Sequence, residues 1–83
     1  SFEKINTAID EIYSDDGGII LMDMGSAVMT TEMVLEMMED RKVTMVDCPV
    51  VEGAIAAAVV AAGNAPMEDV IQVAEAAKTT AKF

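Results

Sequence analysis

The hydrophobic pattern of this chain alternates between helical spacing and short, continuous apolar runs. Over residues 1–13, apolar residues recur every three or four positions, which predicts an amphipathic helix with Ser1 as its N-cap. Residues 18–22 form an unbroken apolar run after an Asp-Asp-Gly-Gly turn, and this run predicts a strand buried on both faces. A second short run, residues 43–46, predicts another strand.

Three more helices are predicted, over residues 26–39, over residues 51–62 and from near Pro66, a favoured first helical residue, with Lys78 and Lys82 suited to the C-terminal end of the last one. The element order is therefore α-β-α-β-α-α, and residues 18–46 form one βαβ unit. A right-handed crossover places the two strand ends, Asp23 and Asp47, on the same edge of the sheet. The predicted fold class is α/β, with a mostly parallel sheet between helices.

Each long helix has an expected apolar face. Methionines recur at helical spacing in the second helix, and packing in a core or an interface explains them better than metal binding does. The expected faces are Phe2, Ile5, Ile9 and Ile12 in the first helix, Val28, Met29, Met33 and Met37 in the second, and Met67, Val70, Ile71, Ala74 and Ala77 in the last.

Charge limits the classes of partner. The 83 residues hold fifteen acidic and five basic residues, for a net charge of −10. Such a balance argues against nucleic acid and against an anionic membrane surface, both of which attract Lys and Arg. Solubility is the first explanation for this charge, and a basic protein partner is the second.

Composition narrows the chemistry further. With 53% apolar residues the chain is typical of a packed protein. The longest apolar stretch, residues 53–63, is too short to span a membrane, and residues 1–16 do not resemble a signal peptide. One cysteine and no histidine exclude a zinc site of the usual kind. We expect a cytoplasmic protein.

The first strand-to-helix junction, Asp23-Met24-Gly25-Ser26, is the main candidate for chemistry. Gly25 would let a ligand approach the backbone, Ser26 would offer a hydroxyl and an N–H, and a helix start favours an anion such as a phosphoryl group. Asp23 would orient a nucleophile from a neighbouring loop. An ordinary capped turn without a ligand explains the pattern equally well.

The second junction, residues 47–54, is a weaker candidate. Glu52 stands at a helix start, where a carboxylate is favourable without any catalytic role, and Gly53 is expected to allow close helix packing. Cys48 would be a nucleophile only with an activating partner, and the chain has no histidine for this. A small buried thiol is the better interpretation of Cys48.

Two strands alone make a poor sheet, because buried parallel strands need neighbours. The chain also opens directly on a helix and without an initiator Met. We therefore expect the 83 residues to be the C-terminal part of a single larger domain, or to be completed by another chain.

The motifs in residues 17–27, 31–33 and 50–58 closely resemble the phosphoryl-donor (DhaM) family of dihydroxyacetone kinase subunits. That family is similar in fold to the mannose-type enzyme IIA domains of the sugar phosphotransferase system. The resemblance runs from Ser1 to about Ala77. It implies that the chain is an incomplete α-β-α-β-α-α portion of an enzyme IIA-like fold, which lacks the N-terminal strand-helix-strand.

The resemblance implies a phosphoryl relay. Family members accept a phosphoryl group from the carrier HPr on a histidine and pass it to ADP held on the DhaL subunit, which phosphorylates dihydroxyacetone on DhaK. No cofactor is bound directly, because ADP and ATP lie on the partner subunit. A cytoplasmic homodimer is implied, with no nucleic acid, membrane or metal.

The absence of histidine is the main departure from the family. The nucleophilic histidine is expected before Ser1, so the fragment alone would be inactive. By resemblance, Asp23, Gly25 and Ser26 form the rim of the phosphoryl pocket, and Glu52 and Gly53 form a weaker, more distant part.

Three alternatives remain at this stage. In the first alternative, the chain is an enzyme IIA domain of a mannose-type sugar transporter. Such domains carry a Gly-Gly-Ser-Pro-like turn at the position of Met24-Gly25-Ser26-Ala27, which counts against this alternative. In the second alternative, the chain is a receiver domain with Asp23 as phosphoacceptor. Receiver domains need a lysine at a later strand end, and Asp47-Cys48-Pro49 supplies none. Or it would be a non-catalytic α/β fragment that completes another sheet.

Overall fold

The element order of the chain is the predicted one. The computed structural model describes residues 1–22 and 27–79. The elements are α1 (Phe2–Ile12), β1 (Gly18–Met22), α2 (Ala27–Glu36), β2 (Val43–Asp47), α3 (Val50–Ala62) and α4 (Met67–Ala76). Ser1 caps α1 as expected, since its hydroxyl accepts a hydrogen bond from the N–H of Lys4. Pro66 is the N-cap of α4 and not its first helical residue.

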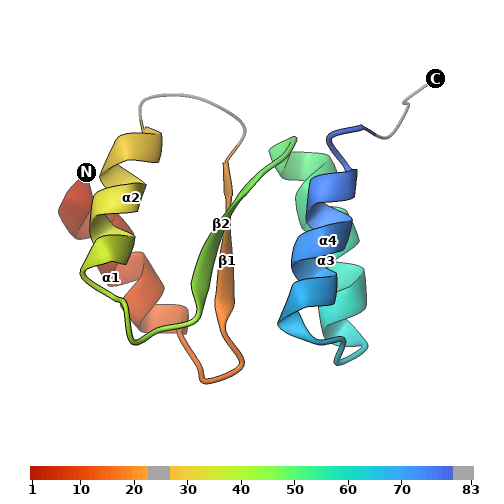
Figure 1. Ribbon diagram of the computed structural model, residues 1–83, viewed down its shortest axis with the longest axis horizontal. Coiled ribbons are helices and arrows are strands. Elements are labelled where there is room, and N and C mark those ends of the chain that lie inside the picture. The colour runs from red at the N-terminus through yellow and green to blue at the C-terminus, as the bar shows by residue number, and fades with distance from the viewer. Residues whose placement is uncertain (23–26, 80–83) are drawn as a thin grey trace.

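The two strands form a parallel sheet that separates two helical layers. Gly18 pairs with Val43 at one end, and Met22 pairs with Asp47 at the other. Helices α1 and α2 lie on one face of the sheet, and α3 and α4 lie on the other (Figure 1). The α/β class and the parallel βαβ unit are therefore confirmed.

The core on the α3–α4 side is built from small residues. The side chains between the sheet and these two helices are closely packed, because the alanines that face the sheet let both helices approach it. Its buried members are Val46, Cys48, Ala57, Val70 and Ala74. The predicted inner face of the last helix is confirmed, since Val70, Ala74 and Ala77 are all buried.

The core on the α1–α2 side corrects the predicted apolar face of α1. It consists of Ile9, Val34 and Met38, with Phe2 and Ile5 packed against it. Ile12 is 80% exposed, so the predicted apolar face of α1 ends one turn earlier.

The methionine stripe of α2 is not part of this core. Met29, Met33 and Met37 are 76%, 57% and 76% exposed. Val34, which is fully buried, fixes the inward side of the helix. Residues 29, 33 and 37 then fall on another side, because each residue advances by about 100° around a helix with 3.6 residues per turn.

Helix α2 also ends three residues earlier than predicted. Its last turn tightens, because the N–H of Met37 donates to the carbonyl of Val34 and that of Met38 to the carbonyl of Leu35. This tighter turn brings Met38 into the core, where it is 7% exposed.

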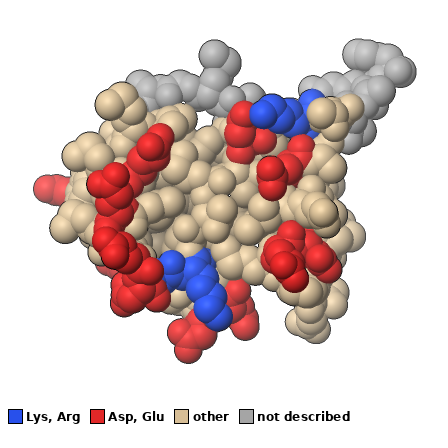
Figure 2. All heavy atoms as spheres, in the orientation of Figure 1, with Lys and Arg blue, Asp and Glu red and all other residues tan. Residues whose placement is uncertain are grey.

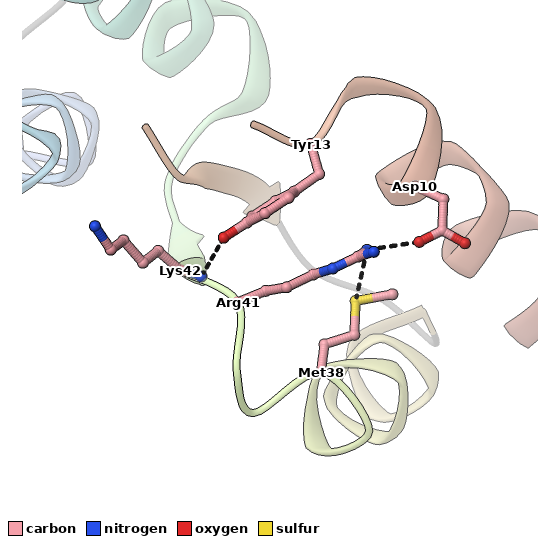
Figure 3. Close-up of polar contacts among 5 residues, drawn as sticks. All are labelled: Asp10, Tyr13, Met38, Arg41 and Lys42. Carbon is pink, nitrogen blue, oxygen red and sulfur yellow. Dashed lines mark hydrogen bonds and ion pairs between the residues drawn. The ribbon is translucent and has the colours of Figure 1, made fainter. Parts of the chain in front are cut away.

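Arg41 joins the end of this turn to α1 (Figure 3). Its guanidinium lies 2.5 Å from the carboxylate of Asp10 and 4.9 Å from the ring centroid of Tyr13. The backbone N–H of Lys42 donates to the hydroxyl oxygen of Tyr13 at 3.0 Å. These contacts fix where β2 begins, next to the first helix.

Gly17 sets the entry into β1. Its φ of +94° lies in the left-handed region that favours glycine. A Cβ at this position would collide with the Sδ of Met67 and would lie 3.0 Å from the carbonyl oxygen of Lys42. The following N–H, that of Gly18, donates to the same carbonyl at 2.7 Å and starts the parallel ladder.

The described residues contain neither a membrane-spanning helix nor a metal-binding cluster. No helix between residues 1–22 and 27–79 has both the length and the apolar character that crossing a bilayer requires. In the same part of the chain, no group of three or more His, Cys, Asp and Glu side chains is arranged to hold a metal ion.

Candidate functional site

The carboxyl ends of both strands meet at one edge of the sheet, as the right-handed crossover predicts. Met22, the last residue of β1, lies opposite Asp47, the last residue of β2. The ladder continues one step further, because the N–H of Cys48 donates to the carbonyl of Met22 at 3.1 Å. Helix α3 then begins at Val50, so its N-terminus lies at this same edge. Open α/β sheets bind their ligands at such an edge.

The three main candidate residues, Asp23, Gly25 and Ser26, lie outside the described residues. In the sequence they follow Met22, whose carbonyl accepts the N–H of Cys48, and precede α2, which begins at Ala27. The roles of the three residues stay predictions.

Lys78 is an unpredicted member of this edge. It lies in the turn after α4, and its ammonium is 2.6 Å from the carboxylate of Asp47. The hydrogen bond to Asp47 and the charge of that carboxylate raise the pKa of Lys78 above 10.5. Both side chains are more than half exposed, at 56% for Lys78 and 64% for Asp47. The pair is thus a screened surface contact that holds a cation at the strand ends.

Gly53 and Cys48 form the packed base of the second junction. Gly53 is buried, and a Cβ there would collide with the Sγ of Cys48. The N–H of Gly53 donates to the carbonyl of Pro49 at 2.8 Å, which closes the first turn of α3. The predicted close helix packing at Gly53 is confirmed. Cys48 is 1% exposed, so the buried-thiol interpretation is confirmed as well.

Glu52 lies in the first turn of α3 and is half-buried. A carboxylate there interacts favourably with the positive end of the helix dipole. Together with Asp47 it gives the second junction two carboxylates against the single ammonium of Lys78. This charge balance is unfavourable for a phosphoryl dianion. The weaker candidacy of Glu52 and Gly53 for the pocket rim stays a prediction.

A cavity of about 580 Å³ lies at the opposite end of the sheet. It is lined by the start of β1 and by the connection between α3 and α4, including Gly18, Asn64 and Met67. Asp16 is the charged residue of its lining, and no Lys or Arg belongs to it. This cavity is therefore unsuited to a phosphoryl anion, and it is distant from the strand ends that carry the candidate chemistry.

Sequence reasoning placed the ends of both strands at one edge of the sheet, but it did not place Lys78 there. The spacing of Lys78 in the last helix suggested only a favourable charge near a helix C-terminus. Asp47 and Lys78 are 31 residues apart, and no local pattern connects them. An unpaired carboxylate at a strand end is the only signal that would have prompted a search for a distant cation.

Comparison with known proteins gives one family and several relatives. A family model described as PTS system fructose IIA component (EIIA-man) matches residues 1–71. No solved structure matches significantly.

The relatives share one name. The chain is 38% identical over 74 residues to the "PEP-dependent dihydroxyacetone kinase, phosphoryl donor subunit DhaM" of Pantoea ananatis, which covers 86% of this chain and 16% of that protein. The subunit of the same name from Escherichia coli is 38% identical over 71 residues, covering 82% of this chain and 15% of that protein. In Listeria innocua, the DhaM of "PEP-dependent dihydroxyacetone kinase 2" is 39% identical over 56 residues, covering 64% and 45%. The chain therefore spans less than half the length of these relatives.

Proposed function

Because the chain belongs to the PTS system fructose IIA component family, whose model matches residues 1–71, we propose that it is part of the phosphocarrier domain of a PEP-dependent dihydroxyacetone kinase. The observation that carries this proposal is the 38% identity to two proteins named as phosphoryl donor subunits of that kinase. The resemblance identified from the sequence motifs is thereby confirmed.

The nucleophile must come from outside these 83 residues, because they contain no histidine. We infer that a strand-helix-strand unit supplies it and joins the sheet next to β1. Within the described residues β1 pairs only with β2, and all five of its residues remain partly exposed. On the neighbouring helical layer, Val51, Ile55 and Val59 of α3 are 66%, 63% and 69% exposed. An added strand and helix would cover both surfaces, which supports this completion.

The first junction then borders the phosphoryl group. In this proposal Asp23 accepts a hydrogen bond from the imidazole N–H that faces away from phosphorus, which keeps the other nitrogen as the nucleophile. Gly25 and Ser26 donate N–H groups to the phosphoryl oxygens at the start of α2. Support comes from the position of Met22, which starts this turn at the carboxyl edge of the sheet.

The proposed partners follow from the relay. The phosphoryl group would arrive from HPr and leave to ADP held on DhaL, with dihydroxyacetone bound on DhaK. ADP and ATP would stay on the partner subunit, and the chain itself would bind no cofactor. We also propose a homodimer in the cytoplasm, with no nucleic acid and no membrane partner, in keeping with the charge of −10.

A second function is an enzyme IIA domain of a sugar transporter. The matching family, the PTS system fructose IIA component family, favours it. Its phosphoryl acceptor would be an enzyme IIB domain and not a nucleotide-binding subunit. A non-catalytic fragment that completes another sheet is the remaining alternative.

The test begins with the intact mass and N-terminal sequence of the native protein. We expect additional residues that include a histidine, and labelled phosphoryl transfer from phosphoenolpyruvate through HPr to that histidine. Onward transfer to ADP in the presence of DhaL supports the kinase function. Transfer to an enzyme IIB domain instead supports the transporter function, and a mass equal to these 83 residues contradicts any histidine relay.

A further inference from the structure

The exposed side of α2 combines two parallel stripes of different chemistry. Met29, Met33 and Met37 follow one another at four-residue spacing, and each is more than half exposed. Glu32 and Glu36 repeat at the same spacing alongside them and are exposed too. We call these five residues the Met/Glu surface.

The orientation of this surface is fixed by the core beneath it. Thr31 and Val34 on the inner side of α2 are 2% and 0% exposed, and Met38 in the turn after α2 is 7% exposed. A rotation of the helix that buried the methionines would expose Val34. It would also bring the carboxylates of Glu32 and Glu36 toward the core. Within the described residues, the packing of this core therefore keeps the methionines exposed.

The charge around the surface has a single sign. Residues 5–40 contain no Lys or Arg. Figure 2 shows acidic side chains on the side of the molecule where α2 lies, and in the sequence the exposed Glu39 and Asp40 follow the helix. Arg41 comes next in the sequence, but its guanidinium is held by Asp10 on the side of α1.

This combination selects the chemistry of a partner. Methionine side chains are flexible and polarisable, and they adapt to apolar groups of different shapes. The flanking carboxylates attract Lys and Arg and repel acidic surfaces. A second copy of this chain would bring carboxylates against carboxylates, and a nucleic acid or an anionic membrane would be repelled as well.

We propose that the Met/Glu surface is a docking site for a cationic amphipathic segment of another protein. The partner presents apolar side chains to Met29, Met33 and Met37, while Lys or Arg at the edge of its apolar face pair with Glu32 and Glu36. This is the helix-on-helix mode of recognition, with apolar anchors at positions three and four apart. The inference goes beyond the phosphoryl relay and does not depend on it.

Two carboxylates in the first turn of α4 provide a matched control. Glu68 and Asp69 are exposed, as Glu32 and Glu36 are. The apolar side of α4 is packed into the core through Val70 and Ala74. An oligolysine probe would not distinguish these carboxylates from those of the Met/Glu surface, whereas a cationic amphipathic one should.

The experiment uses the intact native protein and a synthetic amphipathic helix made of Lys and Leu, with binding measured by calorimetry at low and physiological salt. We expect the triple variant M29Q/M33Q/M37Q and the double variant E32Q/E36Q each to weaken binding at least tenfold. The double variant E68Q/D69N, which removes two exposed carboxylates from the first turn of α4, should bind as the unchanged protein does. Circular dichroism checks that every variant keeps its helical content.

Several results would overturn the proposal. One is equal affinity for oligolysine, which has no apolar side, or for a Glu/Leu peptide of the same pattern. Another is loss of binding in the α4 variant while the α2 variants bind normally, and a third is absence of binding at low salt. Conversion of a dimer to a monomer by M29Q/M33Q/M37Q, measured by sedimentation, would assign the surface to a second copy instead. None of these readouts involves phosphoryl transfer, so they leave the proposed function untouched.

Discussion

The ammonium of Lys78 lies 2.6 Å from the carboxylate of Asp47, although 31 residues separate them in the sequence. The contact ties the turn after α4 to the last residue of β2. It therefore connects the C-terminal end of the described chain to the edge where the candidate site lies. Because both side chains are mostly in solvent, the pair is expected to be weak and sensitive to salt.

The Lys78–Asp47 pair predicts a specific pH dependence. Asp47 raises the pKa of Lys78 in the folded state, so the folded protein holds this proton more tightly than the unfolded one does. The contribution to stability is complete below pH 10.5, and it is lost as the pH rises through the raised folded-state pKa. We expect Lys78→Met to lower the unfolding temperature slightly at neutral pH and to match the unchanged protein at strongly alkaline pH.

Thermal unfolding followed across pH 7 to about 12, the range in which lysine titrates, measures this convergence. Lys4→Met is a suitable control, because no ion pair involves Lys4 in the part of the chain that the structure describes. The control should run parallel to the unchanged protein. A constant difference between Lys78→Met and the unchanged protein at every pH would contradict the assignment.

Gly53 and Cys48 predict a coupled effect on packing. Gly53→Ala would push a methyl group into the Sγ of Cys48 at a buried position. We expect the free energy of unfolding to fall by roughly 1–3 kcal/mol, as is usual for overpacking. Urea denaturation measures it.

The pair also provides its own internal test. Adding Cys48→Ala removes the sulfur and should restore part of the stability lost in Gly53→Ala, so the two effects would not add. Gly63→Ala is the control, because its Cβ would lie 3.5 Å from the nearest atom, in ordinary contact. Additive losses in the double variant would show that the collision is not the cause.

Secondary structure and sheet topology were predictable because each depends on local patterns. The apolar run 18–22 and the turn before it gave the bounds of β1 correctly. The right-handed crossover placed Met22 and Asp47 at one edge without any knowledge of packing. Helix α2 was harder, because two overlapping apolar stripes compete for its inward side.

Met29, Met33 and Met37 belong to the stripe that does not face the core. Thr31, Val34 and Met38 face the core instead, and sequence periodicity did not favour them because Thr31 is polar. A hydroxyl group can be buried when it forms a hydrogen bond. A prediction from hydrophobic periodicity, however, treats threonine as an exposed residue. The Lys78–Asp47 contact was unpredictable for a different reason, since it depends on how α4 lies against β2.

The choice between the two stripes of α2 gives a further prediction. Val34→Ala should lower the free energy of unfolding by roughly 2 kcal/mol, because Val34 is fully buried and its methyl groups leave a cavity. Met37→Ala, at a position 76% exposed, should change it by less than about 0.5 kcal/mol. Urea denaturation of the two variants compares them directly, and a larger loss for Met37→Ala would mean that the helix faces the core with its other side.

The last prediction concerns Asp23, which follows the final residue of β1 at the edge where Lys78 and the start of α3 also lie. If Asp23 orients the histidine that carries the phosphoryl group, Asp23→Ala should slow phosphoryl transfer by about 10²-fold, the scale of loss when a reacting group is misplaced. The unfolding temperature should hardly change, because β1 ends at Met22, before this residue. The matched control is Asp16→Ala, an exposed aspartate at the opposite end of the same strand, which should leave the transfer rate unchanged. Single-turnover transfer from phosphorylated HPr measures both variants, and an unaltered rate in folded Asp23→Ala protein would remove Asp23 from the phosphoryl pocket.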